Sequence, residues 1–121
     1  MNKIKSALII DDNSMDIFIC HRLLENYGVT NVISFNNADS ALSYLKKTDT
    51  KYQVILVDIY MPKTDGFEFI DRFFEFGLQN NQGTIYLLTA SFNPSDKEMA
   101  AKRNIALIEK PLNLEKYLSL V

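Results

Sequence analysis

Two adjacent carboxylates follow an apolar run near the start of the chain. Residues 7–12 read ALIIDD, so a predicted buried strand leads directly into Asp11 and Asp12. Neighbouring acids repel each other and lose solvation when partly buried, and a fold tolerates this only where water, a cation or a basic group compensates the charge. The pair therefore predicts a place where positive charge is bound.

Three more polar residues stand at the ends of other apolar runs. Asp58 follows QVILV, Thr89 closes TIYLLT, and Lys110 follows IALIE. A cluster of carboxylates with no histidine or thiolate beside it suits a hard divalent cation, and Mg²⁺ fits this description best. Because Mg²⁺ keeps several waters and also binds phosphate oxygens, such a site is also a phosphate site.

Asp58 is the residue of this set best suited to covalent chemistry. Aspartate is a known nucleophile toward phosphoryl groups, and a metal ion with a neighbouring lysine spreads the charge that develops on the phosphoryl oxygens. Thr89 would supply a hydroxyl donor and Lys110 a mobile positive charge. Singly, each residue has a simpler interpretation, as a turn former, a strand residue or a solvated charge. Together they predict a phosphoryl site.

The elements that must position these residues alternate along the chain. Five short runs rich in Ile, Val and Leu predict buried strands: 7–10, 31–35, 53–57, 84–89 and 105–109. The segments after each run have apolar residues at helical spacing: Met15, Ile19 and Leu23 with Phe18 and Leu24; Ala38, Leu42 and Leu45; Phe69, Ile70, Phe73 and Phe76; Met99 with Ala100; and Leu114, Tyr117 and Leu118. Alternating strands and helices predict an α/β fold with a parallel sheet covered on both faces.

Boundary residues support these helices. The first helix is capped by Asn13 or Ser14, has Asp16 in its first turn and ends at Tyr27-Gly28. The second helix follows Asn36 or Asn37. The third helix begins at Gly66, and the fourth begins at Pro94-Ser95-Asp96. In such sheets ligands bind beyond the carboxyl ends of the strands, where the strand order reverses. If the order is 2-1-3-4-5, the first and third strands lie about 4.8 Å apart and their terminal acids share one crevice.

Composition restricts the function classes. The chain has 121 residues, of which 47% are hydrophobic and 23% charged, with a net charge of −2. We expect one domain over residues 1–121, and the charge argues against nucleic acid or an anionic membrane as a direct ligand. Cys20 is the only cysteine, which excludes an internal disulfide and fits the cytoplasm. No apolar run approaches the roughly 20 residues of a membrane span, and no signal peptide is evident.

Four fragments in order resemble the response regulator receiver domains, including the stand-alone CheY-like ones. They are the acid pair Asp11-Asp12, the stretch LVDIYMPKTDG with Asp58, Met61-Pro62 and Gly66, the stretch LLTA with Thr89, and Lys110-Pro111. Each fragment alone is weakly specific, but all four at the family's spacings are strongly specific. The resemblance covers the whole chain and implies a doubly wound, flavodoxin-like (βα)5 fold of order 2-1-3-4-5.

The resemblance also implies a role for each site residue. Asp58 would accept the phosphoryl group, Asp12 would ligate Mg²⁺ directly, Asp11 would assist through water, and the backbone carbonyl of Tyr60 would complete the protein ligands. Thr89 and Lys110 would bind the phosphoryl oxygens, and the Lys110-Pro111 bond would be cis.

Partners follow from the same resemblance. The donor would be the phosphohistidine of a histidine kinase or a histidine phosphotransfer protein, and an unidentified downstream protein would recognise the phosphorylated form. The domain would catalyse only its own phosphorylation and dephosphorylation.

Some residues depart from the family pattern. Many receivers carry Tyr or Phe three residues before the site lysine, where this chain has Leu107. We therefore expect the response to centre on residues 89–96, with Phe92 moving most. The side chain of Tyr60, two residues after Asp58, would overhang the phosphoryl site. The segment from Leu112 to Val121 is short for a covering helix.

The third helix carries more phenylalanines than one face can bury. Phe69 and Phe73, with Ile70, should lie in the core, whereas Phe67 and Phe74 are expected to be partly exposed and to hint at a partner surface.

Three other functions fit the sequence less well. An aspartyl phosphatase of the haloacid-dehalogenase type needs an acidic residue two positions after its nucleophile, where Tyr60 stands. An FMN carrier needs a Ser/Thr/Gly-rich phosphate loop, whereas DDNSMD would repel the phosphate. A passive receiver-like binding module would not need all of the acids and the lysine.

Overall fold

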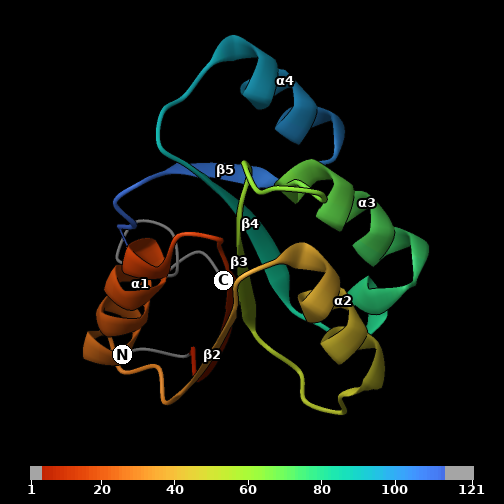
Figure 1. Cartoon of the computed structure of the whole chain (residues 1–121). Helices are drawn as coiled ribbons and strands as arrows, with labels where there is room; N and C mark the ends of the chain where they lie inside the picture. Colours follow the sequence, from red (N-terminus) through yellow and green to blue (C-terminus); the bar gives the residue numbers. More distant parts are fainter. Residues whose placement is uncertain (1–3, 114–121) are drawn as a thin grey trace.

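Five parallel strands form the centre of the computed structural model, which describes residues 4–113 (Figure 1). They are β1 (Ser6–Ile10), β2 (Asn31–Phe35), β3 (Val54–Asp58), β4 (Thr84–Thr89) and β5 (Ala106–Glu109). Their spatial order is β2-β1-β3-β4-β5. The predicted strands and their order are therefore confirmed.

The burial of the strands follows their position in the sheet. Every residue of β1 and β3 is buried, because these strands have neighbours on both sides and helices on both faces. The edge strand β2 exposes Asn31 and Ser34. Ile10 is opposite both Phe35 of β2 and Val57 of β3, so the next residues, Asp11 and Asp58, end neighbouring strands side by side.

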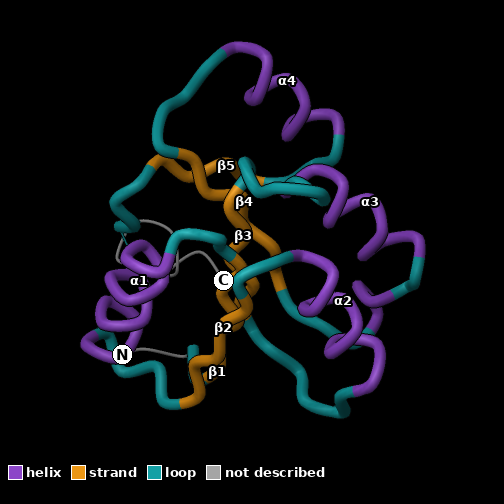
Figure 2. The backbone as a smooth tube through the Cα atoms, in the orientation of Figure 1, coloured by secondary structure: helices purple, strands orange, loops and turns teal. Residues whose placement is uncertain are grey.

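Four α-helices surround the sheet in the described part of the chain: α1 (Ser14–Asn26), α2 (Ala38–Lys47), α3 (Gly66–Glu75) and α4 (Pro94–Lys102), with a short 3-10 helix at Leu78–Asn80. Figure 2 shows α1 on one side of the sheet and α2 and α3 on the other. The fifth predicted helix, around Leu114 to Leu118, lies outside the described residues. No helix within residues 4–113 has the length and apolar character of a membrane span.

Alternate strand residues form a core on each face of the sheet. Leu8, Ile10, Ile55, Val57 and Leu87 pack with residues of α2 and α3 and with Ala100 of α4. Ala7, Ile9, Val54, Leu56 and Leu88 pack with Cys20 and Leu24 of α1. Because β1 and β3 are packed on both faces, their backbones are held in place, and so are the residues at their ends.

The helix caps resolve the alternatives that the sequence left open. Asn13, Asn37 and Asn93 cap α1, α2 and α4, each accepting a backbone N–H three residues ahead. Asp65 caps α3 in a reciprocal capping box with Glu68. Gly28 follows the end of α1 with φ of 99°, a left-handed conformation that favours glycine.

Two expectations about exposed side chains need correction. Phe67 is buried, not partly exposed, because it enters the core at the start of α3 while the Arg103 guanidinium covers its ring at 5.1 Å. Phe74 is exposed as predicted. In α1, Leu24 is buried as its spacing suggests, but Met15, Phe18 and Ile19 are exposed, and Cys20 completes the buried face.

Candidate functional site

Three acids meet at the carboxyl ends of β1 and β3. Asp11 follows β1 and is 2% exposed, Asp58 is the last residue of β3 and is 8% exposed, and Asp12 is exposed to solvent. Carboxylate oxygens of the three residues lie within 4.8 Å of one another. We call Asp11, Asp12 and Asp58 the acid cluster. The structure thus brings together the acids that the sequence singled out.

Local backbone structure fixes the acid cluster. The Asp11 N–H donates to the Phe35 carbonyl at 3.1 Å, and Asp11 Oδ1 accepts from the Asn13 N–H at 3.0 Å. On the β3 side, the Gly66 N–H donates to the Ile59 carbonyl at 2.7 Å. A Cβ at Gly66 would lie 2.6 Å from the Asp58 carbonyl oxygen, so only glycine lets the start of α3 approach this strand end so closely.

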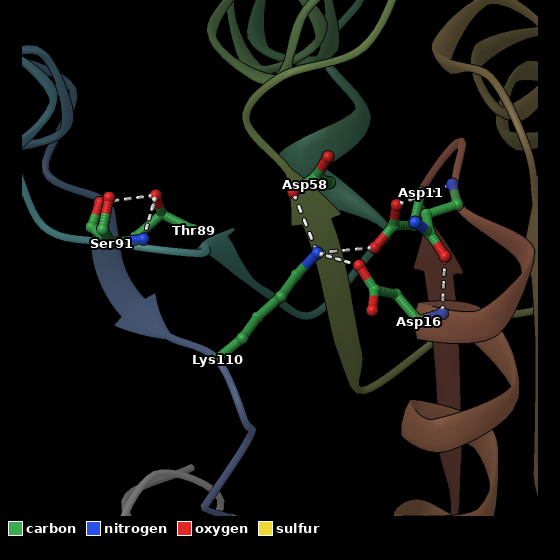
Figure 3. Close-up of polar contacts among 7 residues, drawn as sticks. Asp11, Asp16, Asp58, Thr89, Ser91 and Lys110 are labelled. Carbon is green, nitrogen blue, oxygen red and sulfur yellow. Dashed lines mark hydrogen bonds and ion pairs between the residues drawn. The ribbon is translucent and has the colours of Figure 1, made fainter.

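Lys110 reaches into the acid cluster from the end of β5. Its Nζ lies 2.9 Å from Asp11 Oδ2, 2.9 Å from Asp16 Oδ2 and 3.2 Å from Asp58 Oδ1 (Figure 3). The Lys110 N–H donates to the Thr89 carbonyl at 2.8 Å, which positions the base of the side chain. The Lys110-Pro111 bond is cis, as expected.

Asp16 is a site residue that the sequence interpretation missed. It was predicted only as an acid that favours the first turn of a helix, but its carboxylate projects from α1 toward Lys110 (Figure 3). The position of Asp16 in the first turn of its helix is the sequence feature that could have indicated this role. The first turn of a helix that follows an acidic strand end faces the same edge of the sheet as those acids.

The charges of the site are not balanced. Burial and the negative charge of Asp11 raise the pKa of Asp58 from 3.8 to about 6, although Lys110 acts in the opposite direction. Burial lowers the pKa of Lys110, but its hydrogen bonds to Asp16 and Asp11 outweigh burial and raise that pKa above its ordinary value. The ammonium contacts three carboxylates, and Asp12 adds a fourth to the site, so the negative charges outnumber the positive one and favour a further cation.

The donor set of the acid cluster fits a hard divalent cation. Asp11, Asp12 and Asp58 offer oxygen ligands only, which suits Mg²⁺ or Ca²⁺. Cys20 is the only cysteine of the chain, but it is buried, and that burial together with the charge of Asp11 raises the pKa of its thiol to about 12. The cysteine is therefore a packing residue of the core on the α1 face of the sheet.

Thr89 is close to the site in the sheet, but its hydroxyl is engaged elsewhere. Thr89 is 1% exposed, and its Oγ1 donates to the Ser91 carbonyl at 2.8 Å and accepts from the Ser91 N–H at 3.3 Å. Figure 3 shows the Thr89–Ser91 pair set apart from the acids and Lys110. The structure therefore assembles the acids and the lysine but turns the threonine hydroxyl toward its own loop.

Tyr60 lies beside the site in the loop after β3. Its side chain is 59% exposed, and its hydroxyl donates to Asp96 in the first turn of α4. This hydrogen bond raises the pKa of Tyr60. Asp96 is the second residue missed by the sequence interpretation, where it marked only the start of a helix. No short-range pattern links two residues so far apart in the chain.

Comparisons with known proteins agree with this geometry. A family model described as response regulator receiver domain matches residues 7–121. A two-component response regulator from Cytophaga hutchinsonii is 26% identical with a TM-score of 0.87, over 98% of this chain and 96% of the other. A response regulator from Burkholderia pseudomallei, solved with a phosphorylated aspartic acid and a calcium ion, is 28% identical with a TM-score of 0.78, over 95% of this chain and 65% of the other.

Curated relatives point the same way. Two-component response regulator 24 of Arabidopsis thaliana is 27% identical over 117 residues, which are 96% of this chain and 81% of the relative. Other matches are to small parts of long proteins. The chain spans 10% of the Arabidopsis response regulator ARR2 and 7% of the Schizosaccharomyces pombe histidine kinase mak1.

Proposed function

The chain belongs to the response regulator receiver domain family, and we propose that it is a switch that accepts a phosphoryl group on Asp58 with Mg²⁺ bound. The observation that carries this proposal is the convergence of the acid cluster and Lys110 at one edge of the sheet. Asp11 and Asp58 are both buried and both contact Lys110. We assign the acceptor role to Asp58 because it is the acid that precedes Met61-Pro62 in the receiver pattern.

Asp12, Asp58 and the backbone carbonyl of Tyr60 would hold Mg²⁺ directly, and Asp11 would do so through water. When bound, Mg²⁺ offsets the repulsion among the carboxylates and the charge on the phosphoryl oxygens. Nucleophilic attack and binding of the phosphoryl oxygens are then the tasks of the protein side chains. Asp58 must be ionised to act as a nucleophile, and with a pKa of about 6 it is mostly ionised at neutral pH.

The transfer step exchanges one bond to phosphorus for another. A carboxylate oxygen of Asp58 forms the new P–O bond as the P–N bond of a phosphohistidine breaks, and the electron pair of that bond remains on the imidazole nitrogen. Lys110 leaves Asp11 and Asp16 to contact a phosphoryl oxygen, which it can reach because its ammonium is already beside Asp58. Thr89 exchanges its bond to Ser91 for a second phosphoryl oxygen.

The donor we propose is a histidine kinase or a histidine phosphotransfer protein. Histidine kinases are among the curated relatives, including mak1 and the sensor histidine kinase CheAY of Helicobacter pylori. Movement of Thr89 carries the signal to the loop between β4 and α4, where a downstream protein would recognise it. We place this exchange in the cytoplasm, where a lone cysteine stays reduced.

Phosphorylation by a small donor tests the proposal. The protein is incubated with Mg²⁺ and an acyl phosphate, and the intact mass is measured. We expect one phosphoryl adduct on the wild type and on Asp71→Asn, an exposed acid outside the site, and none on Asp58→Asn. The adduct should be lost in alkali, because acyl phosphates hydrolyse there. An adduct on Asp58→Asn at the wild-type level would show that another residue is the acceptor.

A further inference from the structure

Tyr60 joins the two loops that border the site. Its hydroxyl donates to Asp96 Oδ2 and accepts from Asn93 Nδ2 at 3.3 Å, and Asn93 Nδ2 also donates to Asp96 Oδ2 at 2.8 Å. We call Tyr60, Asn93 and Asp96 the Tyr60 clasp. Tyr60 belongs to the loop that follows Asp58, whereas Asn93 and Asp96 begin α4. The clasp therefore ties the loop after the acceptor residue to the helix that follows Thr89.

The first turn of α4 has few apolar contacts to hold it. Asp96 and Ala100 are the buried residues of this helix, and Met99 packs partly buried against the core. Ala100 and Met99 lie in the second half of the helix, so the buried group of the first turn is the Asp96 carboxylate. A buried carboxylate needs hydrogen-bond donors, and the Tyr60 hydroxyl and the Asn93 amide supply them. The position of this turn thus depends on the clasp.

The β4–α4 loop, residues 90–93, is short and held at both ends. At one end the Thr89 hydroxyl is bonded to Ser91, and at the other end Asn93 belongs to the clasp. Thr89 can turn toward Asp58 only if its bonds to Ser91 break. In a loop of this length, a displacement at Ser91 is transmitted to Asn93 and therefore to the Tyr60 hydroxyl.

We propose that the Tyr60 clasp is a positioning device that holds the β4–α4 loop in its resting arrangement and so sets how readily Thr89 turns to a phosphoryl group on Asp58. This inference rests on the proposed function. The apparent affinity for a ligand rises with the population of the arrangement that binds it. Releasing the clasp should therefore strengthen binding of a phosphoryl group or its mimic.

Tyr60→Phe is the variant that tests the clasp. It removes only the hydroxyl, and it keeps the aromatic ring and the backbone carbonyl assigned to Mg²⁺. Because the side chain is mostly exposed, the variant should fold. The matched control is Asp71→Asn, which weakens the attachment at the other end of α4, where Arg103 Nε and Nη2 contact Asp71 at 2.8 and 2.9 Å.

The first measurement is the affinity for beryllofluoride, a phosphoryl mimic, at saturating Mg²⁺, followed by amide NMR. We expect Tyr60→Phe to bind the mimic about three- to tenfold more tightly than the wild type, the change expected from the loss of one hydrogen bond in the resting state. Asp71→Asn should bind the mimic as tightly as the wild type does. The second measurement is amide hydrogen exchange in the metal-free protein, which should be faster at residues 90–96 in Tyr60→Phe alone.

The possible results distinguish an error in the clasp hypothesis from an error in the proposed function. If the wild type binds beryllofluoride and Tyr60→Phe binds it equally or more weakly, the clasp does not restrain the loop and only this inference is wrong. Unchanged hydrogen exchange at residues 90–96 in Tyr60→Phe overturns it as well. If the wild type binds no beryllofluoride, the proposed function is wrong and the inference falls with it.

Discussion

The ends of β3 and β4 are neighbours in one sheet, yet the groups around them are held in different ways. At the β3 side, the acid cluster stands on two fully buried strands, and Lys110 already contacts Asp11 and Asp58. At the β4 side, the Thr89 hydroxyl is bonded to its own loop, and the first turn of α4 is attached through the polar Tyr60 clasp. One half of the proposed site is assembled, and in our proposal the other half is recruited by the phosphoryl group.

This difference fits the two tasks of a phosphorylated switch. Groups that bind a metal ion and direct the incoming phosphorus work best when they are held in place before the reaction. A segment that reports the reaction must instead have two arrangements of similar free energy, which hydrogen bonds at the surface can provide and a packed core cannot. The predictions below test the two halves in turn.

The largest effect is expected from Asp12→Ala, in the assembled half. Asp12 is the exposed member of the acid cluster and the proposed direct ligand, so its loss should weaken Mg²⁺ binding by about tenfold or more. An NMR titration with Mg²⁺ measures this. Asp49→Ala, an exposed acid outside the site, is the control. Equal Mg²⁺ affinity in Asp12→Ala and the wild type would mean that the ligands are assigned wrongly.

Asp58 should make the metal-free protein less stable as the pH rises. Its pKa is about 6 in the folded protein and near 3.8 when unfolded, so the folded state holds the proton more tightly. Its contribution to the free energy of unfolding is therefore most favourable below about pH 4 and is lost as the pH rises through about 6. We expect Asp58→Asn to raise the free energy of unfolding at pH 7.5 by about 1–3 kcal/mol without metal.

Urea unfolding of both proteins at pH 5 and pH 7.5 measures this effect. The stabilisation by Asp58→Asn should be smaller at pH 5, and saturating Mg²⁺ should reduce it at pH 7.5 by binding the folded wild type. If Asp58→Asn were destabilising at pH 7.5 without metal, burial and the repulsion from Asp11 would not destabilise the ionised Asp58 carboxylate as the geometry indicates.

Lys110→Ala tests whether the lysine competes with the metal ion. The ammonium contacts the same carboxylates that would bind Mg²⁺, so its removal should strengthen Mg²⁺ binding by about three- to tenfold. The same variant should lose the response of the β4–α4 loop to beryllofluoride. Lys102→Ala, at the far end of α4, serves as the control. Weaker Mg²⁺ binding in Lys110→Ala would indicate that the lysine organises the acids instead of competing for them.

The smallest effect on switching is expected at Leu107. This residue of β5 packs partly buried against the core, and it stands where many receivers carry an aromatic side chain. Leu107→Ala should lower the free energy of unfolding by about 1–3 kcal/mol but leave the amide shifts of residues 89–96 on adding beryllofluoride unchanged. Loss of those shifts with intact binding of Mg²⁺ and the mimic would make Leu107 part of the switch.

The assembled half of the site was predictable from the sequence, and the recruited half was not. In a parallel sheet, residues that end neighbouring strands must meet, so Asp11 and Asp58 could be placed together from strand positions alone. Lys110 follows β5 at the same edge of the sheet, and its long side chain reaches the acids past β4. The directions of side chains do not follow from such positions. The contact of Asp16 with Lys110 depends on the reach of a long side chain, and the bond from Thr89 to Ser91 depends on the path of a loop.

The fold was predictable for a similar reason, and its exceptions have a physical cause. Strand runs and capping residues are local signals, so the strand bounds and the four described helices could be found. Helical spacing alone misplaced Phe67, because the close approach of Gly66 to β3 turns the start of α3 inward. In α1 the same spacing identified Leu24, which is buried, but it also included Met15 and Ile19, which are exposed, and it omitted the buried Cys20.

A crystal structure with Mg²⁺ and beryllofluoride tests the contrast between the two halves most directly. We expect the mimic on Asp58, the backbone at Asp11 and Asp58 unmoved, Lys110 Nζ transferred from Asp16 to the mimic, and Thr89 Oγ1 turned from the Ser91 carbonyl to the mimic. A structure in which the mimic is bound to Asp58 while Thr89 still donates to Ser91 would contradict the recruitment of the β4 side. A mimic bound to any residue other than Asp58 would contradict the site itself.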